Sequence, residues 1–128
     1  AQTVVAAIDA RMNEIYLGAF TELDGLMQSI ADEAVILPEE APAYLTSVNA
    51  QITAGHAVGT GFTSYTQLAG QLGLHPCLLQ TEDNLPWAQD MLPQAVASFR
   101  SNEFCDPAQA TPVYLRDKVT WKKLPGRE

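Results

Sequence analysis

The first 115 residues of this chain are nearly without positive charge. They hold two basic residues, Arg11 and Arg100, against thirteen acidic ones, which gives a net charge of −11. The last thirteen residues hold five bases against two acids and carry +3, so the whole chain carries −8. Non-specific nucleic-acid binding depends on neutralising phosphates, so this acidity disfavours it. The basic end could still meet phosphate, an acidic partner or the chain's own acidic surface, or it could be solvated.

Cysteines and long apolar runs are also scarce. Cys77 and Cys105 form no C-x-x-C motif, and we expect two buried, reduced thiols in a cytoplasmic protein, with a single disulfide as the open alternative. No apolar run approaches the ~20 residues of a membrane span, and no signal peptide is visible, so no membrane contact is expected. The chain opens on Ala-Gln-Thr without Met, and we expect it to be a piece of a longer protein.

The common signatures of catalysis are missing from the sequence. His56 and His75 do not form H-E-x-x-H, no G-x-S-x-G elbow occurs, and no Walker lysine follows the Gly-Thr-Gly at 59–61. We expect His56 to be a structural strand residue, His75 a loop residue, and the Gly-Thr-Gly a turn with left-handed residues. The sequence therefore indicates no catalytic residue, no metal site and no cofactor.

The sequence is long enough and apolar enough to form one folded domain. It has 128 residues, a mass of 13.9 kDa and 47% hydrophobic residues, which argues against wholesale disorder. We expect residues 1–128 to form a single domain in which residues 112–128 are a basic tail.

Alternating apolar residues near the start of the chain predict strands. Thr3–Ile8 is expected to be a buried strand, Asp9–Asn13 a turn, and Glu14–Phe20 a second, antiparallel strand. On one face of the second strand would lie Ile15, Leu17 and Ala19. On the opposite face would lie Tyr16, Gly18 and Phe20. An Asp-Gly turn then leads into a third strand near Leu26–Leu37, interrupted around Ala31–Glu33.

Three helices are predicted further along the chain. One begins at the Pro-Glu-Glu triplet at 38–40, with Ala43, Leu45 and Val48 as its apolar face. A second covers Thr63–Leu72 and stops at Gly73. The third and strongest covers Asn84–Arg100, where apolar residues recur every four positions, namely Trp87, Met91, Ala95 and Phe99.

The position of Pro93 and two short strands complete the expected fold. Proline fits the third helix only if the regular part begins near Asp90, which places Pro93 in the first turn. Short strands are expected at Ile52–Val58 and Val113–Leu115. The order β-β-β-α-β-α-α-β predicts an α/β fold, with a mixed sheet and flanking helices.

Two groups of residues are candidates for function. Asp9 and Arg11 lie at the tip of the first hairpin, where a carboxylate after a buried strand could face a cleft; a local Asp–Arg or Arg–Glu contact that stabilises the turn is the alternative. The basic tail contributes aromatic and basic residues that could contact RNA or strap the tail onto the acidic domain, namely Tyr114, Arg116, Trp121, Lys122 and Lys123.

Four segments resemble one known family in the same order along the chain. They are Ile8–Tyr16 (IDARMNEIY), Val58–Phe62 (VGTGF), Ala88–Ala95 (AQDMLPQA) and Pro112–Glu128 (PVYLRDKVTWKKLPGRE). Together they resemble the second, C-terminal half of the bacterial TsaB family, also called YeaZ, and the last segment is the most specific.

This resemblance implies a fold and a role. The family has a two-domain actin-like (ASKHA, ribonuclease H-like) fold, so the chain would be one half of it. The family is an accessory subunit, not an enzyme, in the threonylcarbamoyladenosine modification of tRNA. Its members have also been called glycoprotease-like, although nothing in these residues supports peptide hydrolysis. It pairs with a TsaD-type catalytic subunit and supports assembly with a TsaE-type ATPase, and tRNA joins only within the complex.

We expect the chain to lack the first half of the family, which would leave surfaces exposed and favour self-association, such as a dimer. The sequence thus predicts a non-catalytic accessory subunit fragment. The alternatives are a nucleotide-dependent transferase or glycoprotease-like enzyme, and a standalone self-associating module.

Overall fold

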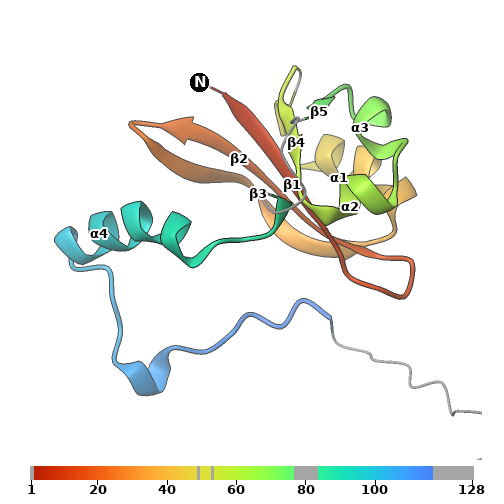
Figure 1. Cartoon of the computed structure of the whole chain (residues 1–128). Coiled ribbons are helices and arrows are strands. Elements are labelled where there is room, and N and C mark those ends of the chain that lie inside the picture. Colours follow the sequence, from red (N-terminus) through yellow and green to blue (C-terminus); the bar gives the residue numbers. More distant parts are fainter. Residues whose placement is uncertain (1, 49, 53, 77–83, 117–128) are drawn as a thin grey trace, which may run out of the picture.

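The computed structural model describes residues 2–48, 50–52, 54–76 and 84–116. We call the first three ranges the body and residues 84–116 the C-terminal region. The body contains a five-stranded sheet with the order β3-β2-β1-β4-β5 (Figure 1). Its first three strands are β1 (Thr3–Asp9), β2 (Ile15–Leu23) and β3 (Leu26–Ile36).

The sheet is mixed. β1, β2 and β3 form an antiparallel meander, whereas β4 (His56–Val58) and β5 (His75–Pro76) continue the sheet from β1 in parallel. β1 is therefore the central strand, paired on both sides. The predicted hairpin and the predicted α/β class with a mixed sheet are both confirmed.

Alternation along the strands divides the sheet into two faces. The inner face packs against three short helices, α1 (Ala41–Ser47), α2 (Thr60–Ser64) and α3 (Leu68–Gln71) (Figure 1). A hydrophobic core forms between them, made of Val5, Ala7, Ile15, Leu17, Ala19, Ala31, Ala41, Leu45, Ala57, Leu68, Ala69, Leu72 and Leu74. The predicted division of the second strand is confirmed, because Ile15, Leu17 and Ala19 are buried together.

The third strand is not interrupted as expected. β3 runs without a break from Leu26 to Ile36, and its pairing with β2 shifts register instead, on either side of the pair Ala19–Ala31. A β-bulge accommodates the extra residues that the sequence pattern indicated as a break.

The helices near residues 38–73 differ in detail from the prediction. A 3₁₀ turn at Pro38–Glu40 precedes α1, whose buried residues are Ala41 and Leu45, while Ala43 and Val48 are exposed. The expected helix over Thr63–Leu72 is two short helices, because Thr and Ser in this stretch are weak helix formers. Gly73, with φ of 66°, ends the second one as predicted.

The short strands also need correction. β4 is limited to His56–Val58 because Ala54 has a φ of 58° and the Gly55 amide donates to the Ile52 carbonyl at 2.9 Å, which makes a turn. His75 was expected in a loop but lies in β5. Val113–Leu115, expected as a strand, pairs with no strand.

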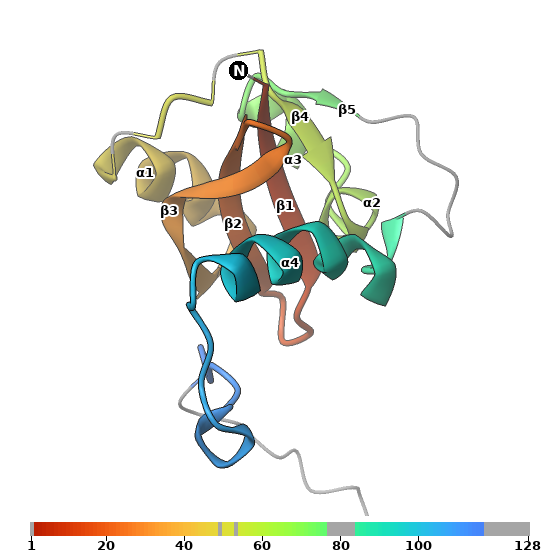
Figure 2. The ribbon, with the colours of Figure 1, turned by 90° about the vertical axis from the view of Figure 1, so that its left-hand side faces the viewer.

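The C-terminal region lies on the side of the sheet opposite α1–α3, which we call the outer face (Figures 1 and 2). A 3₁₀ turn (Ala88–Met91) leads into α4 (Leu92–Arg100), and another 3₁₀ turn covers Pro107–Gln109. Pro93 lies in the first turn of α4 as expected.

None of residues 84–116, all of which the structure describes, is buried. The apolar stripe of α4 comprises Leu92, Val96 and Phe99, together with Met91 directly before the helix. In the order Met91, Leu92, Val96 and Phe99, these side chains are 70, 61, 47 and 70% exposed. The residues of α4 that are partly covered are Ala97 and Ser98. Cys105 was expected to be buried but is an exposed free thiol, and Cys77 lies outside the described residues.

Within the described part of the chain, the model contains no helix with the length and apolar character needed to cross a membrane.

Candidate partner-docking site at the hairpin turn and C-terminal segment

The turn between β1 and β2, residues 9–14, is tightly organised and is called the hairpin turn here. Arg11, Met12 and Asn13 all have left-handed φ angles, of 61, 54 and 60°. The Ala10 amide donates to the Glu14 carbonyl at 2.9 Å, and the Glu14 amide donates to the Arg11 carbonyl at 3.0 Å. Non-glycine residues rarely adopt such angles in succession, so surrounding contacts must hold them there.

The Asp9 carboxylate supplies some of those contacts. It accepts hydrogen bonds from the Arg11 backbone N–H at 2.9 Å and from the Ser64 hydroxyl at 2.7 Å. The Ser64 hydrogen bond, followed by that of the Arg11 amide, lowers the pKa of Asp9 below its ordinary value of 3.8, against a smaller desolvation effect. The Asp9 amide also donates to the Thr60 hydroxyl at 3.1 Å. Asp9 thus joins the hairpin turn to α2, and Arg11 meets it through the backbone.

The Gly-Thr-Gly segment brings α2 close to β1. Gly59 has a φ of 108°, and a Cβ there would lie 2.3 Å from the Ala7 carbonyl oxygen. At Gly61 a Cβ would lie 2.8 Å from the Cβ of Ala7. Both glycines therefore allow close packing. The expected turn with left-handed residues is reduced to Gly59, because Thr60 and Gly61 are the first residues of α2. The Gly59 amide donates to the Asn84 side chain at 3.1 Å, which ties the start of the C-terminal region to this turn.

Arg116 anchors the other end of the C-terminal region. Its Nη1 donates to the Ala10 carbonyl at 2.8 Å, and its Nη2 lies 3.1 Å from a Glu14 carboxylate oxygen and 3.4 Å from the Arg11 carbonyl. The guanidinium also lies over the Tyr16 ring, 5.7 Å from the centroid. Its side chain is only 15% exposed. Two carbonyls, one carboxylate and one aromatic ring thus hold a residue that lies about a hundred positions away in sequence.

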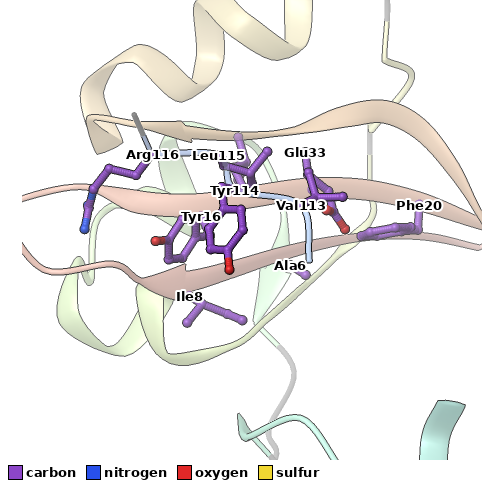
Figure 3. Close-up of a pocket in the computed structure, with 11 residues that line it drawn as sticks. Ala6, Ile8, Tyr16, Phe20, Glu33, Val113, Tyr114, Leu115 and Arg116 are labelled. Atoms are coloured by element: carbon purple, nitrogen blue, oxygen red, sulfur yellow. The ribbon is translucent and has the colours of Figure 1, made fainter. Parts of the chain in front are cut away.

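An apolar groove lies on the outer face beside this anchor. Its volume is about 480 Å³, and Figure 3 shows the side chains around it, contributed by β1, β2, β3 and residues 113–116. The walls include Ala6, Ile8, Tyr16, Phe20, Glu33 and Tyr114. Tyr114 and Val113 line the groove yet remain 80 and 78% exposed. The segment therefore covers the sheet loosely and leaves apolar surface open.

The structure brings together residues that the sequence presented separately. Asp9 and Arg11 belong to the hairpin turn, and Arg116 binds that same turn. Glu14 and Tyr16, which sequence reasoning did not single out, are the partners of Arg116. Trp121, Lys122 and Lys123 lie outside the described residues. Among residues 2–48, 50–52, 54–76 and 84–116, no group of three or more His, Cys, Asp or Glu side chains is placed to hold a metal ion together.

Comparison with known proteins connects this arrangement to one group of relatives. No protein-family model matches the chain. The chain is 38% identical over 129 residues to the tRNA threonylcarbamoyladenosine biosynthesis protein TsaB of Escherichia coli strain K12, covering all of this chain and 54% of that protein. It is 37% identical over 136 residues to the protein of that name from Haemophilus influenzae, covering all of this chain and 53% of that protein.

Solved structures lead to the same relatives. A Pseudomonas aeruginosa protein described as uncharacterized and similar to the peptidase YEAZ superposes with a TM-score of 0.67 at 32% identity, over 91% of this chain and 50% of that one. YeaZ from Pseudomonas aeruginosa superposes with a TM-score of 0.66 at 29% identity, over 89% of this chain and 50% of that one. The resemblance to the TsaB/YeaZ family is confirmed over the whole of this chain, which spans about half the length of the curated relatives it matches.

Proposed function

We propose that this chain is part of a non-catalytic, cytoplasmic accessory subunit that supports threonylcarbamoyladenosine modification of tRNA. In this role it works by pairing with a TsaD-type catalytic subunit and a TsaE-type ATPase, and it meets tRNA only within the complex. The observation that carries the proposal is the similarity to TsaB proteins over the full length of the chain.

We further propose that residues 1–128 form a single domain, the C-terminal half of a two-domain actin-like protein. The five-stranded mixed sheet with helices on its inner face supports this assignment. So does the superposition on about half of each YeaZ structure.

The apolar stripe of α4 is the contact surface that this proposal uses. Three large apolar side chains on the nine-residue α4, and Met91 directly before it, are 47 to 70% exposed. Contiguous apolar surface of this kind marks an interaction site. The matched relatives are about twice as long as this chain. We therefore assign the remaining half of a TsaB-length protein as the occupant of this stripe; self-association occurs when that half is lacking.

The basic tail is the second contact surface that this proposal uses. Arg116 fixes residues 113–116 beside the hairpin turn, and Trp121, Lys122 and Lys123 follow in the sequence. We propose that Tyr114, Arg116 and these three residues form a surface for a partner or for tRNA, with Asp9 and Arg11 facing the neighbouring cleft.

Size-exclusion chromatography with light scattering tests the pairing. The chain is mixed with a TsaD-type subunit, with and without a separately produced polypeptide that corresponds to the other half of a TsaB relative. We expect this chain and the other half to co-elute, and both to co-elute with the TsaD-type subunit. A chain that binds neither contradicts the role of α4. Binding of the other half without recruitment of the TsaD-type subunit contradicts the subunit pairing.

A pair of variants localises the contact. Replacing Phe99 with Gln on the α4 stripe should abolish co-elution with the other half, because the side chain is an exposed anchor for a hydrophobic contact. Met27→Gln is the matched control, since Met27 is an exposed apolar residue of β3 at 43%. Equal loss in both variants would contradict a specific role for α4.

An enzyme remains the second candidate, because one solved relative is described as similar to a peptidase. Nucleotide turnover or peptide hydrolysis that disappears in Asp9→Ala, while the fold is retained, would replace the accessory role by a nucleotide-dependent transferase or glycoprotease-like activity. Turnover that is equal in Asp9→Ala and the parent would show that this carboxylate is not catalytic.

A further inference from the structure

The two histidines of this chain lie opposite each other on neighbouring parallel strands. His56 in β4 and His75 in β5 are register partners, so their side chains leave the same face of the sheet. His56 also pairs with Val4, whose neighbour Val5 points into the core, which places both imidazoles on the outer face. His56 is half-buried and His75 is exposed, so solvent reaches the pair.

The two rings lie near the greatest distance at which two imidazoles can share a metal ion. Their centroids are 6.3 Å apart and the ring planes are inclined by 48°, which excludes parallel stacking. A metal–nitrogen distance of about 2.0 Å places a bound ion roughly 3 Å from each ring centre, so two ligating rings lie at most about 6 Å apart. The observed separation of 6.3 Å slightly exceeds this limit, so both side chains must rotate toward each other before their ring nitrogens can reach one ion.

The backbone holds both strands in position for this. A Cβ at Gly55, directly before His56, would lie 2.9 Å from the carbonyl oxygens of Thr3 and Ile52, so the chain is closely packed there. The His75 amide donates to the Gly55 carbonyl at 2.8 Å, and the preceding Leu74 is buried. Two ligands on fixed strands lose little freedom when they bind an ion.

We propose that His56 and His75 form a two-imidazole site for a divalent transition-metal ion of the Cu²⁺, Ni²⁺ or Zn²⁺ class. Imidazole suits these ions, and their affinity order places Cu²⁺ first. Water completes the coordination, since no third His, Cys, Asp or Glu among the described residues joins the pair. The site is separate from the hairpin turn and from the partner surface of α4.

Isothermal titration with Ni²⁺ and Zn²⁺ tests the site in a tag-free chain. Cys77 and Cys105 are both replaced by Ser in every sample, because thiolates would compete for these ions. We expect one ion per chain in this parent. His75→Asn and His56→Asn should each lower the affinity about tenfold or more, because a second ligand on the same scaffold acts at high effective concentration. Glu39→Gln, which alters an exposed carboxylate on α1's side, is the control and should bind as the parent does.

Two further readouts separate the outcomes. Zn²⁺ should shift the ring resonances of both histidines together in NMR spectra, and light scattering should show an unchanged mass when Ni²⁺ is added. Equal affinity in the parent and either histidine variant overturns the proposal. A metal-dependent doubling of mass also overturns it, because the ion would then bridge two chains instead of joining two strands.

Discussion

The body and the C-terminal region use similar apolar residues in opposite ways. In the body, side chains such as Val5, Ile15 and Leu17 are at most 1% exposed and pack into one core. In the C-terminal region, Leu92 and Phe99 are 61 and 70% exposed on a helix of good amphipathic pattern. An apolar stripe in a sequence therefore predicts a surface that is buried in a contact. It does not show whether the contact is with the same chain or with another molecule.

The largest expected change in stability comes from a substitution in the core of the body. Leu17→Ala should lower the free energy of unfolding by about 2 to 5 kcal/mol, since it leaves a cavity in the core. Leu92→Ala removes the same atoms from an exposed helix position and should cost less than about 0.5 kcal/mol in the chain alone. Urea unfolding of both variants measures the contrast. Equal losses would mean that α4 is packed in solution.

The second effect concerns the approach of α2 to β1. Gly59→Ala should destabilise the body by about 1 to 3 kcal/mol, because φ of 108° strains any side chain and its Cβ would meet the Ala7 carbonyl. Gly70→Ala is the matched control: a Cβ there meets nothing within 4 Å, and alanine in α3 should stabilise by roughly 0.5 to 1 kcal/mol. Thermal unfolding of both variants measures the difference. A Gly59→Ala variant as stable as the parent would contradict the close packing of α2 against β1.

A third, smaller effect concerns the anchor between the two regions. In a double-mutant cycle with Arg116→Gln and Glu14→Gln, we expect a coupling energy of about 1 kcal/mol, because the pair is only partly buried. Arg116→Gln should also speed hydrogen exchange at the Ala10 and Glu14 amides of the hairpin turn. A coupling energy of zero would show that Arg116 does not bind the turn through Glu14. Arg100→Gln, which changes a basic residue of α4, should leave these amides unaffected.

The smallest effect concerns pH. The pKa of Asp9 is lowered in the folded chain, so its stabilising contribution is present above the ordinary value of 3.8 and is lost as the pH falls through the lower folded pKa. Ser64→Ala removes the main cause and should raise the pKa of Asp9 toward 3.8, as followed by NMR titration of the carboxyl carbon. Ser47→Ala on α1 should leave it unchanged. An unmoved Asp9 in Ser64→Ala would disprove this hydrogen bond.

Local patterns predicted much of the body. The alternation over residues 3–20 determined two strands, their hairpin and the buried set of Ile15, Leu17 and Ala19. Gly59 and Gly73 were correctly interpreted as turn and stop positions. These features depend on steric preferences of a few neighbouring residues, which a single sequence contains.

Local sequence patterns could not predict contacts between residues that are distant in the sequence. Nothing near Arg116 in sequence indicates that it binds the Ala10 carbonyl and Glu14, because that contact needs the tail to return to the hairpin turn. The pairing of His56 with His75 likewise depends on a crossover through two helices. Periodicity predicted a helix over Asn84–Arg100, of which only Leu92–Arg100 is α-helical. It could not show that the apolar stripe of this helix stays exposed.

The two ends of the sheet determine how copies of this chain can aggregate. One border, β3, is eleven residues long, but its register shifts and the adjacent Asp32 and Glu33 disturb the flat, uncharged ladder that fibrils extend. The other border, β5, has two residues and ends in Pro76, which has no amide to donate. In the part of the chain that the structure describes, both borders thus disfavour strand-by-strand polymerisation, and a concentrated solution should yield discrete complexes instead of amyloid.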